Sequence, residues 1–210
     1  MKNIELDYNI EKPFVPTYTE NMYPTFQEAA KEIYLDNNTP RIVLLDIDGV
    51  LLDHLDKLPA YALLNKSKIE EEKQGYVSAL YYKYGDNLMV VTNRDPNINM
   101  FLSSKYVVEQ AKQSTEDIYK HIGDGKEMKI FDGLFKQFPF FSKKKKEHLV
   151  EYISTLIPEG ESPVLTMIED WCIASLNRRT FPMYIANTLS KKYNIRCNVE
   201  NYVIKNEPGW

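Results

Sequence analysis

The segment RIVLLDIDGVLLD, residues 41–53, joins an apolar run to two aspartates and a glycine. After Arg41, the four residues from Ile42 to Leu45 are all aliphatic, and the run is too short for a helix. Runs that are apolar on both faces are typical of buried strands, usually in parallel sheets. The segment therefore predicts a buried strand over residues 41–45, which delivers acidic side chains at its carboxyl end.

The rest of the chain alternates between similar apolar runs and helical patterns. Further strands are predicted over residues 88–91, 129–135, 164–168 and 195–203. Helices are predicted over residues 26–35, 66–84, 100–121, 142–157 and 172–191. Thr25 and Glu28 form a capping box at the start of the first helix, and Pro182 predicts a kink or break in the last. The expected fold class is therefore α/β, with a doubly wound, mostly parallel, Rossmann-like sheet and helices on both faces.

Composition places the chain among ordinary globular proteins. It has 210 residues, of which 43% are hydrophobic and 27% charged, which argues against extensive disorder. The formal net charge of −4 disfavours a strongly basic nucleic-acid binder. There is no apolar run long enough to span a bilayer, and the first 12 residues lack the apolar stretch of a signal peptide. The two cysteines form no CxxC pair and suit a reducing compartment, so we expect a cytoplasmic protein. The absence of a long apolar run leads us to expect no membrane partner.

Three of the predicted strands end in polar residues. In open α/β sheets, ligands bind beyond the carboxyl ends of the strands. The residues found there are Asp46 and Asp48, Thr92, and the pair Glu169-Asp170. Carboxylates at positions i and i+2 point the same way, and packed carboxylates repel one another unless a cation lies between them. A few hard oxygen ligands suit Mg²⁺, so the sequence predicts a magnesium site at this edge of the sheet.

Four segments resemble, in order, the motifs of the haloacid dehalogenase (HAD) superfamily. They are IVLLDIDGVLLD, MVVTNR, SKKKKEHLVEYI and VLTMIEDW, and together they span residues 41–171. Each motif is weak by itself, whereas the ordered set is specific. The resemblance implies a Mg²⁺-dependent phosphomonoester hydrolase that acts through an aspartyl-phosphate intermediate.

The resemblance also implies a role for each catalytic residue. Asp46 would be the nucleophile that attacks phosphorus, and Asp48 would protonate the leaving oxygen and then activate water. The hydroxyl of Thr92 would hold phosphoryl oxygens, and Lys146 would offset negative charge in the transition state. Lys146 is preferred because apolar residues follow it at +3, +4 and +7. Lys145 fits this spacing only in part, and Lys143 lies beside the cap residue Ser142.

The implied metal ligands are Asp46, Asp48 through its carbonyl, Asp170 and, as a helper or indirect partner, Glu169. Asn93 and Arg94 follow Thr92 and are candidates for substrate binding. Two features depart from the family pattern. Ala174 and Ser175 stand where a further acid is often found, and the segments 54–86 and 96–143 are too short for a large cap domain. We therefore expect residues 39–210 to form a HAD-like catalytic domain without a large cap, with residues 1–38 as an arm and helix packed on it.

Several alternatives stay open at this point. The substrate could be a phosphorylated small molecule or a nucleotide, and a nucleotidase or a phosphatase for nucleic-acid 3′ or 5′ ends would have the same fold. A catalytically degenerate HAD-like binding protein is a rival of another class, favoured by the acid missing from the fourth motif. A phospho-receiver is disfavoured. Its phosphate-accepting residue would lie on the middle strand, after an acidic pair on the first strand and before a threonine and a lysine, and the strand near Phe131 lacks that arrangement.

Overall fold

The computed structural model describes residues 14–52, 69–92, 105–122, 127–132, 134, 143–170 and 179–205. One six-stranded sheet forms its centre, with the strand order β1-β6-β5-β2-β3-β4 and all neighbouring strands parallel. The strands are β1 (Tyr18–Tyr23), β2 (Arg41–Leu45), β3 (Leu88–Val91), β4 (Lys129–Phe131), β5 (Val164–Asp170) and β6 (Val199–Ile204). The predicted α/β fold with a parallel sheet is confirmed.

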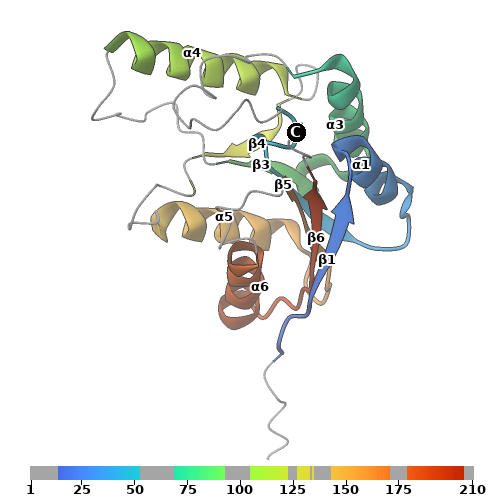
Figure 1. Cartoon of the computed structure of the whole chain (residues 1–210). Coiled ribbons are helices and arrows are strands. Elements are labelled where there is room, and N and C mark those ends of the chain that lie inside the picture. The colour runs from blue at the N-terminus through green and yellow to red at the C-terminus, as the bar shows by residue number, and fades with distance from the viewer. Residues whose placement is uncertain are drawn as a thin grey trace, which may run out of the picture.

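Helices cover both faces of this sheet (Figure 1). They are α1 (Phe26–Leu35), α3 (Glu71–Tyr84), α4 (Lys105–His121), α5 (Lys143–Leu156) and α6 (Thr180–Tyr193), and a short 3₁₀ turn, η1 (Gly85–Asn87), precedes β3. The helices α1, α3 and α4 pack on one face, and α5 and α6 pack on the other. The sheet is therefore the middle layer of three.

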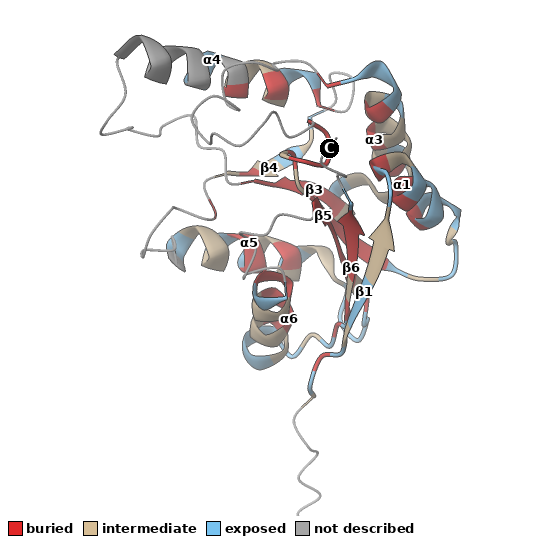
Figure 2. Cartoon of the chain, viewed as in Figure 1, coloured by how far each residue is buried: buried red, intermediate tan, exposed pale blue. Residues whose placement is uncertain are grey.

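Strand alternation divides the interior into two apolar cores. Val43 and Leu45 of β2 join the core under α1, α3 and α4, whereas Ile42 and Leu44 join the core under α5 and α6. Figure 2 shows the buried residues concentrated in the strands and on the inner sides of the helices. Because β2 is buried on both faces, its unbroken apolar run is what a central parallel strand requires.

Most of the predicted elements are confirmed, with shifts at their ends. The helix over 26–35 and the strands over 41–45 and 88–91 lie where they were predicted, and Thr25 caps α1 by accepting a hydrogen bond from the Glu28 backbone N–H (3.3 Å). The strand predicted to end at residue 168 continues to Asp170. Pro182 causes no kink, because it lies in the first turn of α6, where no intrahelical N–H bond is lost.

The amino-terminal segment differs from the expected arm in one respect. Residues 18–23 are extended, as predicted, but they form an edge strand, β1, that pairs with β6 from Tyr18 opposite Val199 to Tyr23 opposite Ile204. The side chains of β1 are half-buried or exposed, and its sequence, YTENMY, contains no apolar run. The sequence pattern therefore gave no sign of the pairing.

A buried ionic cluster ties the strands together at the amino edge of the sheet. The guanidinium of Arg41, which is 6% exposed, donates to the Thr166 hydroxyl (2.8 Å) and to the carboxylates of Asp36 and Glu200. Hydrogen bonds from Thr39 and Arg41 hold the pKa of Asp36 well below its usual range. Arg41 thus joins the end of α1 to β5 and β6.

This cluster predicts acid-sensitive stability. Asp36 is ionised in the folded state at pH values where it is protonated in the unfolded chain, so its contribution is complete above about pH 4 and is lost as the pH falls toward its folded-state pKa. Asp36→Asn should lower the free energy of unfolding by about 2 kcal/mol at pH 7 and by less at pH 2.5. Urea denaturation of both proteins at the two pH values tests this. An equal difference at both would assign the effect to something other than the ionised carboxylate.

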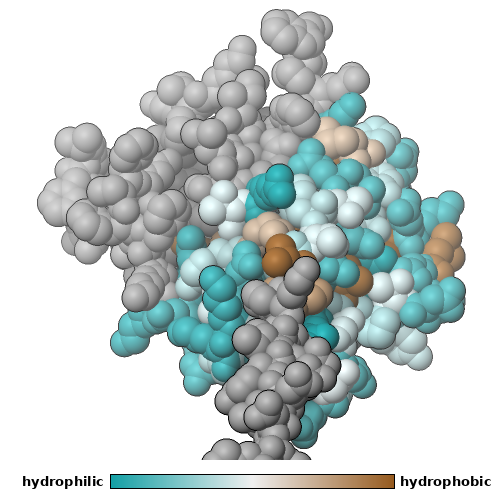
Figure 3. All heavy atoms as spheres, turned by 90° about the horizontal axis from the view of Figure 1, so that it is seen from below, coloured by the Kyte–Doolittle hydropathy of each residue, from teal (hydrophilic) through white to brown (hydrophobic). Residues whose placement is uncertain are grey.

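The described surface is mainly polar. The exposed large hydrophobic residues are Val15, Tyr34, Leu35, Tyr82 and Tyr193. In Figure 3, hydrophobic residues on the face in view occur in small groups among hydrophilic ones. Among the described residues, no helix has the length and apolar character needed to cross a membrane.

Candidate active site

The order of the sheet brings the three polar strand ends together. Starting from β2, the chain builds β3 and β4 on one side, whereas β5 and β6 lie on the other side. The direction of winding therefore reverses between β2 and β5, and such a reversal opens a crevice at the carboxyl ends of the strands. Asp46 follows β2 at this point, Asp170 ends β5, and Thr92 follows β3, the other neighbour of β2.

Asp46 continues the pairing of β2 with β5. Its backbone N–H donates to the Ile168 carbonyl (3.0 Å), and its own Oδ1 accepts a hydrogen bond from the Ile47 N–H (2.7 Å). Removal from water raises the pKa of Asp46 well above its usual value, and the nearby charges of Asp48 and Asp170 raise it further. The carboxylate is thus fixed in orientation and placed among other acids, which favours a bound cation.

The turn after Asp46 is compact and anchored by apolar side chains. The Gly49 N–H donates to the Leu52 carbonyl (2.7 Å), and the Leu51 N–H donates to the Ile47 carbonyl (2.9 Å). Ile47 and Leu51 are buried in the core under α1, α3 and α4. This anchoring leaves Asp48 partly exposed in a backbone that the rest of the turn holds in place.

Gly49 provides the space that Asp170 occupies. A Cβ atom on Gly49 would lie 2.5 Å from Asp170 Oδ2 and 2.6 Å from both its Cβ and Cγ atoms. Gly49 also has a φ of +77°, which residues with a Cβ rarely adopt. The Asp170 carboxylate therefore packs directly on the backbone of Gly49, and only a residue without a Cβ leaves room for it.

The two acids that end β5 have different surroundings. Both are 7% exposed, and strand alternation sends their side chains to opposite faces of the sheet. Asp170 lies on Gly49, whereas Glu169 Oε1 accepts a hydrogen bond from Asn201 Nδ2 (2.6 Å) on β6. Asp170 therefore shares the site with Asp46, and Glu169 is held toward β6.

Asn201 is a residue that the sequence analysis missed. The signal that could have found it is an amide directly before the apolar run from Tyr202 to Ile204; the structure shows that this amide is fully buried. Its carbonyl Oδ1 has no hydrogen-bond partner among the described residues. A polar side chain in such a position indicates a specific interaction, because an apolar residue would be easier to bury.

Thr92 lies at the end of β3 and is fully buried. Its N–H donates to the Phe131 carbonyl (3.0 Å), and its carbonyl accepts from the Leu134 N–H (3.3 Å). These bonds fix its backbone to the end of β4 and to Leu134 just beyond it. The two substrate-binding candidates that follow it, Asn93 and Arg94, lie outside the described residues.

Two lysines at the start of α5 have different neighbours. Lys145 Nζ donates to Asp132, both to the backbone carbonyl (3.1 Å) and to Oδ1 (2.9 Å), just beyond β4. Lys146 Nζ lies over the rings of Phe181 and Tyr184 on α6, and burial lowers its pKa. Lys145 is thus held at the carboxyl edge of the sheet on the β4 side. The catalytic role of Lys146 stays a prediction.

The predicted magnesium site needs few protein ligands. Within the described ranges, no group of three or more His, Cys, Asp or Glu side chains is arranged to hold a metal ion. The proposed ligand set of Asp46, Asp170 and the Asp48 carbonyl contains only two carboxylates. Repulsion from Asp48 and Asp170 contributes to the raised pKa of Asp46, and a bound divalent cation would relieve this repulsion. These residues therefore fit Mg²⁺. The role of Glu169 as a helper or indirect partner of the cation stays a prediction. Ala174 and Ser175, which stand where the fourth motif often has a further acid, lie outside the described residues.

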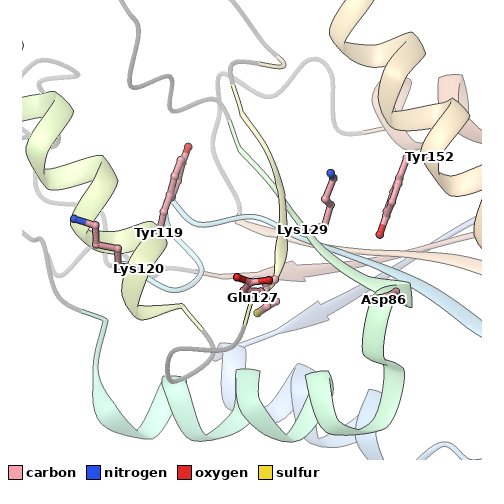
Figure 4. Close-up of a pocket in the computed structure, with 7 residues that line it drawn as sticks. Asp86, Tyr119, Lys120, Glu127, Lys129 and Tyr152 are labelled. Carbon is pink, nitrogen blue, oxygen red and sulfur yellow. The ribbon is translucent and has the colours of Figure 1, made fainter.

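A separate cavity of about 510 Å³ lies beside the amino ends of β3 and β4, whereas the acids lie at the carboxyl ends of the strands. It adjoins η1 and the start of β4, and Figure 4 shows Tyr119 and Tyr152 on either side of Lys129 and Glu127. Its lining mixes both charges, with two acids and two lysines. The cavity is thus far from the strand ends that carry the acids.

Comparison of this chain with protein-family models, curated proteins and solved structures finds no match. Any functional assignment therefore depends on the chemistry of the residues themselves.

Proposed function

We propose that the protein is a Mg²⁺-dependent phosphomonoester hydrolase in which Asp46 is the nucleophile. The observation that supports this most is the convergence of Asp46, Asp48 and Asp170 at the reversal between β2 and β5. Asp46, Asp170 and the Asp48 carbonyl would hold the cation. When bound, Mg²⁺ supplies positive charge that screens a phosphoryl group from these carboxylates.

The proposed reaction has two steps, which form and then hydrolyse an aspartyl phosphate. A carboxylate oxygen of Asp46 attacks phosphorus, the bond to the leaving alcohol breaks, and Asp48 donates its proton to the departing oxygen. Asp48 then takes a proton from water, and the water oxygen attacks the phosphorus of the aspartyl phosphate. The bond between phosphorus and the Asp46 oxygen breaks, which releases inorganic phosphate and restores the Asp46 carboxylate. The Thr92 hydroxyl would donate to a phosphoryl oxygen, and a lysine at the start of α5 would offset the charge that develops.

The proposed substrate is a phosphorylated small molecule or a nucleotide, or the phosphorylated end of a nucleic acid. A screen of nucleotides and of 3′- and 5′-phosphorylated oligonucleotides would separate these classes. The expected absence of a large cap concerns the segments 54–86 and 96–143. Residues 54–68, 96–104, 123–126, 133 and 135–142 of these segments lie outside the described residues, so this expectation stays a prediction.

Removal of divalent cations should abolish hydrolysis of p-nitrophenyl phosphate. We expect at least a hundredfold lower rate in EDTA and full recovery when Mg²⁺ is added in excess, because the acids cannot otherwise accept a dianionic phosphoryl group. Mg²⁺ should also raise the Tm of the protein, as any ligand specific for the folded state does.

Two results would contradict the proposal. One is hydrolysis that continues unchanged in EDTA. The other is a folded protein that neither turns over any of the phosphoesters tested nor responds to Mg²⁺, which would favour a binding function instead.

A further inference from the structure

A row of polar groups crosses three neighbouring strands on the sheet face that α5 and α6 cover. Asn201 of β6 lies between Glu169 of β5 and Tyr18 of β1. Its Nδ2 donates to Glu169 Oε1 (2.6 Å) and to the Tyr18 hydroxyl oxygen (3.0 Å). The Tyr18 hydroxyl in turn donates to Glu20 Oε2 (2.8 Å). One amide therefore connects the edge strand to an acid that directly precedes Asp170.

The row lies in an otherwise apolar setting. Asn201 is completely buried, and the same face carries Val199, Leu165 and Met167. Burying an amide is costly unless its hydrogen bonds are made. The amide makes two good donor bonds, while its carbonyl has no partner among the described residues. The two hydrogen bonds donated by Nδ2, rather than the packing of the side chain, thus explain why an asparagine occupies this buried position.

A neutral donor has a different effect on a carboxylate than a cation has. At the amino edge, Arg41 is paired with Asp36 and Glu200 and carries a charge opposite to theirs. Asn201 instead fixes the orientation of Glu169 without bringing a charge of its own. Glu169 directly precedes Asp170, and its charge adds to those of Asp48 and Asp170 in raising the pKa of Asp46, although its side chain is held toward β6.

We infer that Asn201 is a positioning residue for the site that Asp46, Asp48 and Asp170 form, here called the acid site. Asn201 holds Glu169 as a fixed negative charge beside the proposed Mg²⁺ ligands, and it connects the acid site to β1. This inference rests on the proposed function. Glu169 then strengthens cation binding through its charge, without being a ligand itself. Residues that hold a metal site from outside typically change metal affinity ten- to a hundredfold when they are replaced.

Two variants separate position from charge. Asn201→Leu removes the donor and lets Glu169 leave its place. Glu169→Gln keeps an oxygen that can accept from Asn201 but removes the charge. For both variants, we expect the Mg²⁺ dissociation constant, measured by calorimetry without substrate, to rise about tenfold. The Mg²⁺ concentration that gives half-maximal hydrolysis should rise equally, while kcat at saturating Mg²⁺ stays within about threefold of the original.

Ser78→Ala is the matched control. Ser78 also has a buried hydroxyl without a partner among the described residues, but it lies on α3, on the other face of the sheet. Its Mg²⁺ dissociation constant should not change. Tyr18→Phe keeps the bond between Asn201 and Glu169, so its effect should be smaller than that of Asn201→Leu.

The outcomes distinguish this inference from the proposed function. If the unaltered protein neither binds Mg²⁺ nor hydrolyses phosphoesters, the proposed function fails and the inference fails with it. If the unaltered protein does both, but Glu169→Gln binds Mg²⁺ as tightly as before, the inference alone is overturned. Glu169→Gln also decides the matter if Asn201→Leu does not fold, as judged by circular dichroism.

Discussion

Asp46→Asn is expected to lower phosphoester hydrolysis by about a thousandfold or more while the fold survives. An amide cannot attack phosphorus as a carboxylate does, so the covalent step is lost. The backbone N–H of residue 46 still donates to Ile168, and the new side-chain oxygen can still accept from Ile47. The local structure therefore has the same hydrogen bonds in both proteins.

Stability should be unchanged or should increase in Asp46→Asn. The raised pKa of Asp46 means that its ionised form is less favourable in the folded chain than in the unfolded chain, so ionisation at neutral pH costs folding free energy. A neutral amide removes this cost, together with the repulsion from Asp48 and Asp170. We expect Tm at pH 7, without Mg²⁺, to be equal to or higher than that of the original protein.

The measurement pairs kcat for p-nitrophenyl phosphate at saturating Mg²⁺ with the Tm of each variant. Asp86→Asn is a suitable control, since Asp86 lies in η1 at the opposite edge of the sheet and is exposed. It should keep full activity. An Asp46→Asn protein that is folded and fully active would rule out an aspartyl-phosphate mechanism at this residue.

Gly49→Ala is expected to be the most damaging small substitution in the site. The added methyl group would overlap the Asp170 carboxylate, and the φ of +77° would strain any residue with a Cβ. Overpacking and the strained backbone together should cost about 3 kcal/mol of folding stability. Because the side chain that must move is a proposed Mg²⁺ ligand, the rate at limiting Mg²⁺ should fall about a hundredfold.

Gly160→Ala separates the two causes. Gly160 has a similar φ of +83°, but a Cβ there would meet no atom within 4 Å. This variant should lose only about 1 kcal/mol, from backbone strain, and should keep its activity and Mg²⁺ dependence. Denaturation curves and Mg²⁺ titrations of the two variants give the comparison. Equal losses of stability, with Mg²⁺ dependence unchanged in both, would show that Asp170 does not rely on the space at Gly49.

The features that the sequence predicts are those encoded locally. The strand over residues 41–45 follows from an apolar run that only a doubly covered strand can bury, and the start of α1 follows from Thr25 and Glu28. The positions of Asp46, Thr92 and Asp170 at strand ends follow from the same runs. Their convergence was inferred from the general property that parallel strands end at one edge.

The features that the sequence does not predict depend on distant partners. The side chains of β1 are only partly covered, so its residues need not be apolar and form no apolar run. Its pairing depends on β6, which lies far away in the sequence. The packing of Asp170 on Gly49 and the bond from Asn201 to Glu169 join residues from different strands. Such contacts are determined by the order of the strands, which no short segment encodes.

The pairing of β1 with β6 also has a consequence for how the protein folds. Among the described strands, β1 pairs only with β6, Tyr18 lying opposite Val199, so the sheet cannot be completed until the chain is available as far as β6. Contacts so distant in sequence slow folding, because a long loop must close before they form. We therefore expect β1 to dock late, after the strands from β2 to β6 have assembled. Since Tyr18 ends the row of polar groups that reaches Glu169, the acid site would reach its final form in that last step.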